Sequence, residues 1–293
     1  MRNAVKWPGG ARSAVILTVD FNDDLGIRTQ TPAIEGREKS LSVWRYGAKR
    51  GVHRLLDTLA EYDVPSSWLV PGQVVRTHRD LVGLIDAAGH EMGISGDACE
   101  DFDALDLAQQ KHAFDRGYAA LAEALGRAPV GFRPFTGNWA TGFAAHLNAR
   151  GIAWTSAWHG DDLPYYQHDA PLIELPLHVE LEDEPYFAFN LAPPVPVGQS
   201  RIASYREVLD NWTRDFEAFH RFGLCFVMRL HPEIIGTAGR IGVLRSLLAT
   251  MRARGDVWFA TGAQAASWWR ERCDANEAGH PVEIFERHRN TIV

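Results

Sequence analysis

The sequence of 293 residues has few cysteines, no long apolar run and no surplus of positive charge. Its three cysteines, Cys99, Cys225 and Cys273, are scattered and form no CxxC pair, which argues against a disulfide framework and against a zinc knuckle. No stretch approaches the ~20 apolar residues of a membrane span, and the N-terminus lacks the apolar segment of a signal peptide. We therefore expect a soluble, cytoplasmic protein with no membrane partner.

The charge balance and the length narrow the class of protein further. A net charge of −7 argues against nucleic acid as a partner, because duplex-binding domains carry a basic surplus that neutralises phosphates. With 46% hydrophobic and 23% charged residues, the chain is an ordinary globular sequence, long enough for one α/β barrel or two small domains. Since no Pro/Gly/Ser-rich linker or charge run divides the chain, we expect one domain over residues 1–293.

Patterns typical of buried strands alternate with helical patterns along most of the chain. The run 14–19 is continuously apolar or β-branched and ends at Asp20, as in a strand buried on both faces. Further strands are predicted at residues 67–70, 91–95, 130–133, 152–156, 172–177, 224–230 and 257–260, and helices at residues 51–62, 79–88, 107–125, 141–149, 205–222, 241–254 and 263–272. This alternation predicts an α/β fold with a parallel sheet, which at this length favours a barrel closed on itself.

Two stretches break the alternation, residues 26–49 and residues 178–204. Both are too long for ordinary connections between a strand and a helix. The second contains a proline-rich run at residues 192–196. We expect both stretches to be loops that cover a site or build a subunit contact.

Polar residues end or follow several of the predicted strands. In an α/β barrel the chemistry lies at the carboxyl ends of the strands, so these residues are candidates for function. They are Asp20, Ser95, Arg133, Ser156, Glu174, His231 and Thr261. If Asp20 and His231 converge from distant strands, they supply general acid–base catalysis, in which one group deprotonates a water and the other protonates a leaving group.

Six short segments, in order along the chain, carry a family resemblance. They are Trp7-Pro8-Gly9-Gly10, Asp20-Phe21-Asn22, Gly89-His90-Glu91, Gly131-Phe132-Arg133-Pro134, Trp154-Thr155-Ser156-Ala157 and Leu230-His231-Pro232. Together they resemble the motifs of the polysaccharide deacetylase (NodB-homology) superfamily. Residues 172–176 and 258–262 also fit its branch of allantoinase-like and cyclic-imide-hydrolysing members. The resemblance implies a distorted (β/α) barrel, similar to a TIM barrel, with about seven strands.

The resemblance also implies roles for three of the residues at strand ends. Asp20 matches the catalytic base of the family, Arg133 matches the arginine that orients this base, and His231 matches the general acid. Members of the allantoinase-like branch are commonly homo-oligomers. The resemblance therefore implies a homo-oligomer here as well.

The three positions that hold a metal in the family are all substituted in this chain. The resemblance implies that an aspartate and two histidines bind a catalytic divalent ion, but Asn22, Ser95 and Cys99 stand at these positions. Neutral amide and hydroxyl oxygens bind zinc more weakly than a carboxylate and an imidazole do. We therefore predict a site with no metal and no other cofactor. The alternative is a divalent ion held by shifted ligands: Asp23, Asp24, Asp97 or Cys99.

A site with no metal restricts the substrate. Metal-bound water reaches a pKa of about 7 against about 15.7 for free water, so without the ion the carbonyl must be activated by ring strain or a good nitrogen leaving group. We predict a hydrolase that opens a C–N bond of a small cyclic amide, imide or ureide. Contacts with this substrate are predicted for Ser95, Trp139, Glu174 and Trp158. A metal-dependent deacetylase with rearranged ligands and a catalytically inactive family member remain the alternatives.

Overall fold

The protein is built on a curled nine-stranded sheet, and the computed structural model describes residues 5–197 and 202–283. The strands follow the order β10-β1-β2-β3-β4-β5-β7-β6, β11 pairs with β1, and only β6 runs antiparallel to its neighbour. They are β1 (Ser13–Asp20), β2 (Ser66–Val70), β3 (Glu91–Ile94), β4 (Gly131–Phe132), β5 (Trp154–Thr155), β6 (Tyr165–Tyr166), β7 (Ile173–Glu174), β10 (Cys225–Leu230) and β11 (Val257–Ala260). A separate ladder joins β8 (Asn190–Leu191) to β9 (Pro194–Val195).

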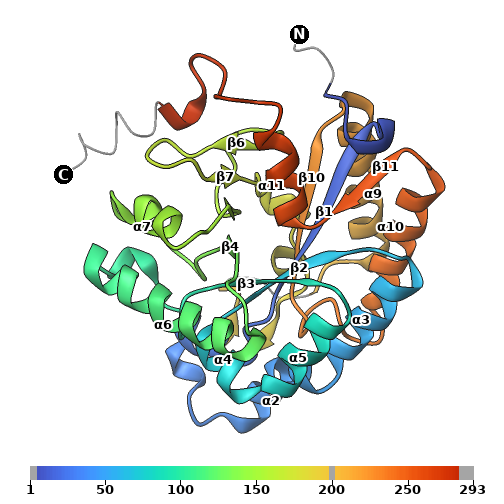
Figure 1. The fold of residues 1–293 in the computed structure, drawn as a ribbon. Helices are drawn as coiled ribbons and strands as arrows, with labels where there is room; N and C mark the ends of the chain where they lie inside the picture. The colour runs from blue at the N-terminus through green and yellow to red at the C-terminus, as the bar shows by residue number, and fades with distance from the viewer. Residues whose placement is uncertain (1–4, 198–201, 284–293) are drawn as a thin grey trace.

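Most helices cover the outer side of the curled sheet, whereas the helix over residues 262–270 packs against its inner side (Figure 1). The helices are α1 (Leu25–Gln30), α2 (Glu38–Trp44), α3 (Val52–Glu61), α4 (Gly72–Thr77), α5 (Arg79–Ala87), α6 (Leu107–Leu125), α7 (Phe143–Ala149), α8 (Glu184–Phe187), α9 (Tyr205–Phe222), α10 (Ile241–Ala253) and α11 (Gly262–Arg270). α11 contacts β1, β5 and β7, and its Trp268 stacks on Trp7 with 4.8 Å between ring centroids. Within the described residues, no helix combines the length and the apolarity that crossing a bilayer requires.

The central strand β1 divides its side chains between the two sides of the sheet. Val15 and Leu17 pack outward in the larger hydrophobic core, whereas Ala14 and Ile16 belong to a second core shared with β7, β10 and α11. Because side chains alternate along a strand, Asp20 faces the same inner side as Ala14 and Ile16. The inner side of β1 therefore changes from apolar at the start of the strand to charged at its end.

The predicted elements agree with the structure wherever the apolar pattern is long. α6, α9 and β11 have the predicted bounds, while β4, β5 and β7 are only two residues long. The prediction of two loops was wrong in part, because residues 26–49 contain α2 and most of α1, and the described part of 178–204 contains α8, β8 and β9. Residues 198–201 of the second stretch lie outside the described residues. The helices and strands within these two stretches have two to seven residues each, which is too short to give a clear apolar period in the sequence.

Within the described residues the sheet is curled but does not close, because no hydrogen-bonded ladder joins β7 to β10. The segment after β7 instead runs beside β10, where Glu182 forms a single parallel bridge with Arg229. This differs from the predicted closed barrel. Residues 26–49 contact residues 178–204 near this bridge, because Gln30 Nε2 donates to Glu184 Oε1 at 3.2 Å. Both stretches therefore lie near the carboxyl end of β10.

Candidate active site

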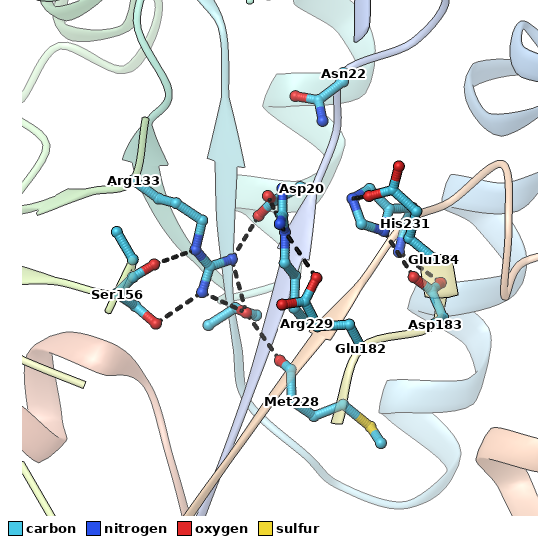
Figure 2. Close-up of polar contacts among 12 residues, drawn as sticks. Asp20, Asn22, Arg133, Ser156, Glu182, Asp183, Glu184, Met228, Arg229 and His231 are labelled. Atoms are coloured by element: carbon cyan, nitrogen blue, oxygen red, sulfur yellow. Dashed lines mark hydrogen bonds and ion pairs between the residues drawn. The ribbon is translucent and has the colours of Figure 1, made fainter. Parts of the chain in front are cut away.

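Alternation along the strands brings four charged side chains together at the carboxyl end of the sheet. Asp20 ends β1, Arg229 lies near the end of the neighbouring β10, and His231 follows β10. Arg133 follows β4, farther around the curl. Figure 2 shows Asp20 between Arg133 and His231. The structure thus brings together the three residues predicted to act in catalysis and adds Arg229 to them.

Two arginines hold the Asp20 carboxylate. Arg133 Nη1 donates to Oδ1 at 2.7 Å, and Arg229 Nε donates to Oδ2 at 2.7 Å. Burial by itself would raise the pKa of Asp20, but the charges of the two guanidinium groups outweigh burial and lower the pKa to about 2. Asp20 is therefore an anion at neutral pH. Each of its oxygens keeps a second lone pair that can accept from another donor.

Contacts on both sides fix the Arg133 guanidinium. Two of its nitrogens donate to Thr18 Oγ1 at 3.0 Å, and the group also donates to Ser156 Oγ at 2.8 Å and to the Ser156 carbonyl oxygen (Figure 2). Together with the bond to Asp20, these contacts use all five N–H donors of the guanidinium. Arg133 is therefore held in one orientation, as expected for a residue that positions the Asp20 carboxylate.

Asp183 binds His231 through both the ring and the backbone. The Nδ1 atom lies 2.6 Å from Asp183 Oδ1, and the backbone N–H of His231 donates to Oδ2 at 2.8 Å. Burial alone would lower the pKa of the imidazole, but the charge and hydrogen bond of Asp183 outweigh burial and raise the pKa to about 9. His231 is therefore protonated at neutral pH. Its Nε2 lies 4.0 Å from Glu184 Oε2, beyond hydrogen-bond distance.

Two more carboxylates balance the buried cations. Arg229 Nη1 donates to Glu182 Oε2 at 3.2 Å. Burial would raise the pKa of Glu184, but the charges of His231 and Arg229 outweigh burial and lower it. Each cation of the site thus has a nearby anion, which allows charged groups to remain buried.

The substituted metal-ligand positions do not fit the ion of the family. Cys99 Sγ lies 3.8 Å from Asn22 Oδ1, and both residues are buried, as is Ser95. Burial, together with nearby carboxylates, raises the pKa of the Cys99 thiol well above its ordinary value. Without an ion, the Cys99 side chain is therefore a neutral thiol at neutral pH. The three positions offer an amide, a hydroxyl and a thiol, all of them neutral.

The carboxylates predicted as shifted ligands already have partners. Asp97 lies between two arginines, at 2.6 and 3.0 Å, and Asp24 also binds two arginines, at 2.6 and 3.1 Å. Asp23 Oδ2 pairs with His78 Nε2 at 2.9 Å, whereas its Oδ1 is buried and has no hydrogen-bond partner. Over the described residues, none of the three belongs to a cluster of three or more close ligand atoms. The geometry therefore disfavours an ion held by Asp24 or Asp97, while Asp23 keeps one oxygen without a partner.

Glu174 has a role inside the fold in place of the predicted substrate contact. The side chain is fully buried, and one of its oxygens accepts from the backbone N–H groups of Ala157 and Trp158. The other oxygen accepts from Thr155 Oγ1 and from Gln167 Nε2. These four bonds occupy the carboxyl group and fasten β7 to the segment that follows β5.

The remaining predicted substrate contacts differ in their surroundings. Trp139 is 3% exposed and packs against Phe132 and Phe143, so the structure places it in the aromatic core. Trp158 is half-buried and meets Trp139 edge-on, with 5.8 Å between ring centroids. Ser95, in contrast, has a buried Oγ with no hydrogen-bond partner. Of the four residues, Ser95 keeps a polar atom that another molecule can bind.

Glu233 is a second buried group with an oxygen that lacks a partner. The residue is 5% exposed, and its Oε2 makes no hydrogen bond. This oxygen lies against the segment that precedes α3, because a Cβ added at Gly47 would meet Oε2 at 2.9 Å. Burial raises the pKa of Glu233 to about 8, so the carboxyl group is mostly neutral at pH 7. A neutral carboxyl group can donate a hydrogen bond.

Sequence reasoning missed Arg229, Asp183 and Glu233. A signal for Arg229 was present, since it is the one charged residue in the apolar run 224–230. Asp183 lies in a run of three acidic residues within a stretch predicted to be a loop, and nothing local pairs it with His231. Glu233 follows His231 and Pro232 closely, but its burial becomes evident only from the fold.

Comparisons with known proteins agree with this architecture. Residues 41–154 match the family model described as Polysaccharide deacetylase. A Mycobacterium smegmatis protein, provisionally described as a polysaccharide deacetylase, is 30% identical to this chain with a TM-score of 0.85, and the match covers 93% of this chain and 95% of that one. The comparisons confirm the predicted fold class, a distorted α/β barrel of the polysaccharide deacetylase type.

Two other similar proteins have names that indicate different substrates. The structure of an allantoinase, PuuE, has a TM-score of 0.77 and 19% identity, covers 94% of this chain and 96% of that one, and bears on the fold. A peptidoglycan deacetylase from Helicobacter pylori is 23% identical, over 64% of this chain and 73% of that protein. The two names point to different substrates on one fold.

Proposed function

This chain belongs to the polysaccharide deacetylase family, and we propose that it opens a small cyclic amide, imide or ureide by hydrolysis without a bound metal ion. One observation carries the proposal: an anionic Asp20 and a protonated His231 lie beside ligand positions that are all neutral. The chain keeps a base and an acid, while the groups that would hold an ion are gone. The allantoinase among the structural neighbours is compatible with a cyclic substrate.

In the proposed reaction Asp20 takes a proton from the attacking water. A carboxylate with a pKa of about 2 is a weak base, since general bases work best with a pKa near the working pH. A weak base needs an electrophilic carbonyl, and strained rings and imides are more electrophilic than an acetamide. The two arginines that hold Asp20 therefore favour a cyclic substrate over an N-acetyl group.

His231 supplies the proton for the leaving nitrogen. The water oxygen bonds to the carbonyl carbon, a proton of the water passes to Asp20, and the C–N bond breaks with its electron pair on nitrogen. This nitrogen takes the proton from His231 Nε2, and the ring opens to a chain with a new carboxyl group. Asp183 at Nδ1 stabilises the protonated ring and leaves Nε2 as the atom that delivers the proton.

Glu233 and Ser95 are the candidates for binding the carbonyl oxygen on which negative charge develops. Each has a buried oxygen with no partner, and an unmet buried polar group costs about 1–3 kcal/mol. A substrate that accepts from these groups would remove that cost. Donors directed at the developing charge would also stabilise the transition state.

The proposal is tested by incubating chelator-treated protein with succinimide, hydantoin, allantoin, dihydrouracil and an N-acetylglucosamine oligomer. We expect opening of at least one ring at an unchanged rate after chelation, and no release of acetate. Asp20→Asn should lower the rate by at least ~100-fold, the usual contribution of a general base. Asp57→Asn, an exposed residue of α3, is the matched control.

Two results would contradict the proposal. Release of acetate that is lost on chelation and restored by zinc would support the metal-dependent deacetylase. No turnover of any ring or acetamide by the folded protein would support an inactive family member.

A further inference from the structure

Three potential metal ligands lie together in the segments that follow β5 and β7, beside the start of β10 and apart from the candidate active site. His159 and Asp162 belong to the segment between β5 and β6, and His178 follows β7. One ligand atom from each residue lies within 4.8 Å of the others. His159 and Asp162 are exposed, whereas His178 is 3% exposed. A single ion can therefore reach all three residues from the solvent side.

His178 has an unmet nitrogen directed at this cluster. Its Nε2 is buried, has no hydrogen-bond partner and lies 3.5 Å from Asp162 Oδ1. Two ligands at about 2.0–2.1 Å from one tetrahedral zinc ion are ~3.4 Å apart, which agrees with this separation. The other nitrogen, Nδ1, faces the Glu180 carboxylate, with 3.6 Å between Nδ1 and Oε1.

The two imidazole rings of the cluster also lie close together. Their centroids are 3.9 Å apart, so both rings can reach one ion.

The cluster opens onto a pocket of about 840 Å³ that His159 and Asp162 help to line. Free coordination positions of an ion would therefore face solvent, with room for water or a small ligand. The Asp162 carbonyl oxygen accepts from the N–H of Cys225, which begins β10. His231 lies at the other end of this strand, six residues away, or roughly 20 Å at 3.3 Å per residue. The cluster is separate from Asp20 and His231.

We propose that His159, Asp162 and His178 bind a divalent transition-metal ion of the zinc type. Two imidazoles and one carboxylate suit such an ion, whereas calcium and magnesium prefer sites made of oxygen alone. The ion would join the segments that follow β5 and β7 beside the start of β10. These segments border the side where the sheet does not close by strand pairing, so metal binding should raise the thermal stability of the protein.

The test is calorimetric titration of tag-free, chelator-stripped full-length protein with zinc chloride, together with the visible spectrum of the cobalt-loaded protein. We expect binding of one equivalent and a higher melting temperature in zinc. His159→Ala and Asp162→Asn, both exposed positions, should each weaken binding at least ~10-fold. His112→Ala, an exposed histidine of α6, should leave binding unchanged.

Two results would overturn the site. One is the absence of zinc binding by the folded wild-type protein, and the other is equal affinity in wild type, His159→Ala and Asp162→Asn. Asp20→Asn should bind zinc like wild type, and zinc binding that is lost in this variant would place the ion at the catalytic centre instead. Since the titration needs no substrate, its outcome does not depend on whether the ring-opening reaction is found.

Discussion

Asp183→Asn tests whether the Asp183 carboxylate sets the charge of His231. The substitution keeps an oxygen for the backbone N–H of His231 but removes the negative charge 2.6 Å from Nδ1. Burial and the charge of Arg229 both lower the pKa of His231, so without Asp183 it should fall from about 9 to its ordinary value of 6.5 or below. A change of this size is on the order of 3 kcal/mol between the two protonation states.

The consequence is a shift in the pH dependence of activity. In wild type the rate should fall first near pH 8, as the Glu233 carboxyl group ionises, and again as the pH rises through about 9, where the proton donor His231 loses its proton. In Asp183→Asn the fall caused by His231 should move below pH 7. At pH 8 the protonated fraction of His231 drops from about 0.9 to about 0.03, so the rate should drop by roughly 30-fold or more.

The free energy of unfolding should also depend on the ion pair between Asp183 and His231. Because the folded pKa of His231 lies above its ordinary 6.5, protonation contributes stability that is complete below pH 6.5 and is lost as the pH rises through about 9. Asp183→Asn should therefore destabilise the protein most at low pH. Breaking a buried pair typically costs about 3–5 kcal/mol in the free energy of unfolding.

The measurements are a pH–rate profile on the best ring substrate and an NMR titration of the His231 ring, which needs no substrate. Asp57→Asn, an exposed aspartate of α3, controls for the substitution itself. An unchanged ring titration in Asp183→Asn would refute the assignment of the charge to this pair. A rate profile that does not shift with the ring titration would refute His231 as the proton donor.

Three further predictions concern the walls of the site. Gly51→Ala places a Cβ 2.0 Å from the Pro232 carbonyl oxygen, so the free energy of unfolding in urea should fall by about 3 kcal/mol. The control Gly83→Ala, in the exposed face of α5 with no atom within 4 Å, should raise it by up to ~1 kcal/mol. Glu233→Gln keeps a donor and should retain most of kcat, whereas Glu233→Ala should lower kcat by at least ~10-fold; equal rates in the two variants would contradict a donor role. Burial and the raised pKa of its thiol should protect Cys99 from alkylation in the native protein, and rapid modification detected by mass spectrometry would reveal a thiolate able to bind metal.

The fold and half of the catalytic centre follow from local patterns. Apolar runs such as 14–19 are long enough to predict strands, and α6 and α9 have clear helical periods. Once β1 is predicted, alternation places Asp20 at its end on a defined side. The resemblance to a family adds Arg133 and His231, and the structure brings both to Asp20.

The partners of these residues could not be predicted in the same way. Asp183 lies 48 positions before His231 in the sequence, and Arg229 lies 209 positions after Asp20. The short elements α1, α2 and α8 carry too few residues to show a period, so the stretches that contain them read as loops. Glu174 read as a substrate contact because its four internal hydrogen bonds depend on how β5 and β7 pack.

By itself the sequence determined the order of the longer strands and helices and the residue types Asn22, Ser95 and Cys99 at the substituted ligand positions. These properties depend on side-chain type and on spacings of a few residues. Only the tertiary structure decided the charge states of Asp20, His231 and Glu233, because a pKa depends on burial and on charges brought close by folding. The same holds for the cluster of His159, Asp162 and His178, whose residues come from two segments of the chain that the pairing of β5 with β7 brings together.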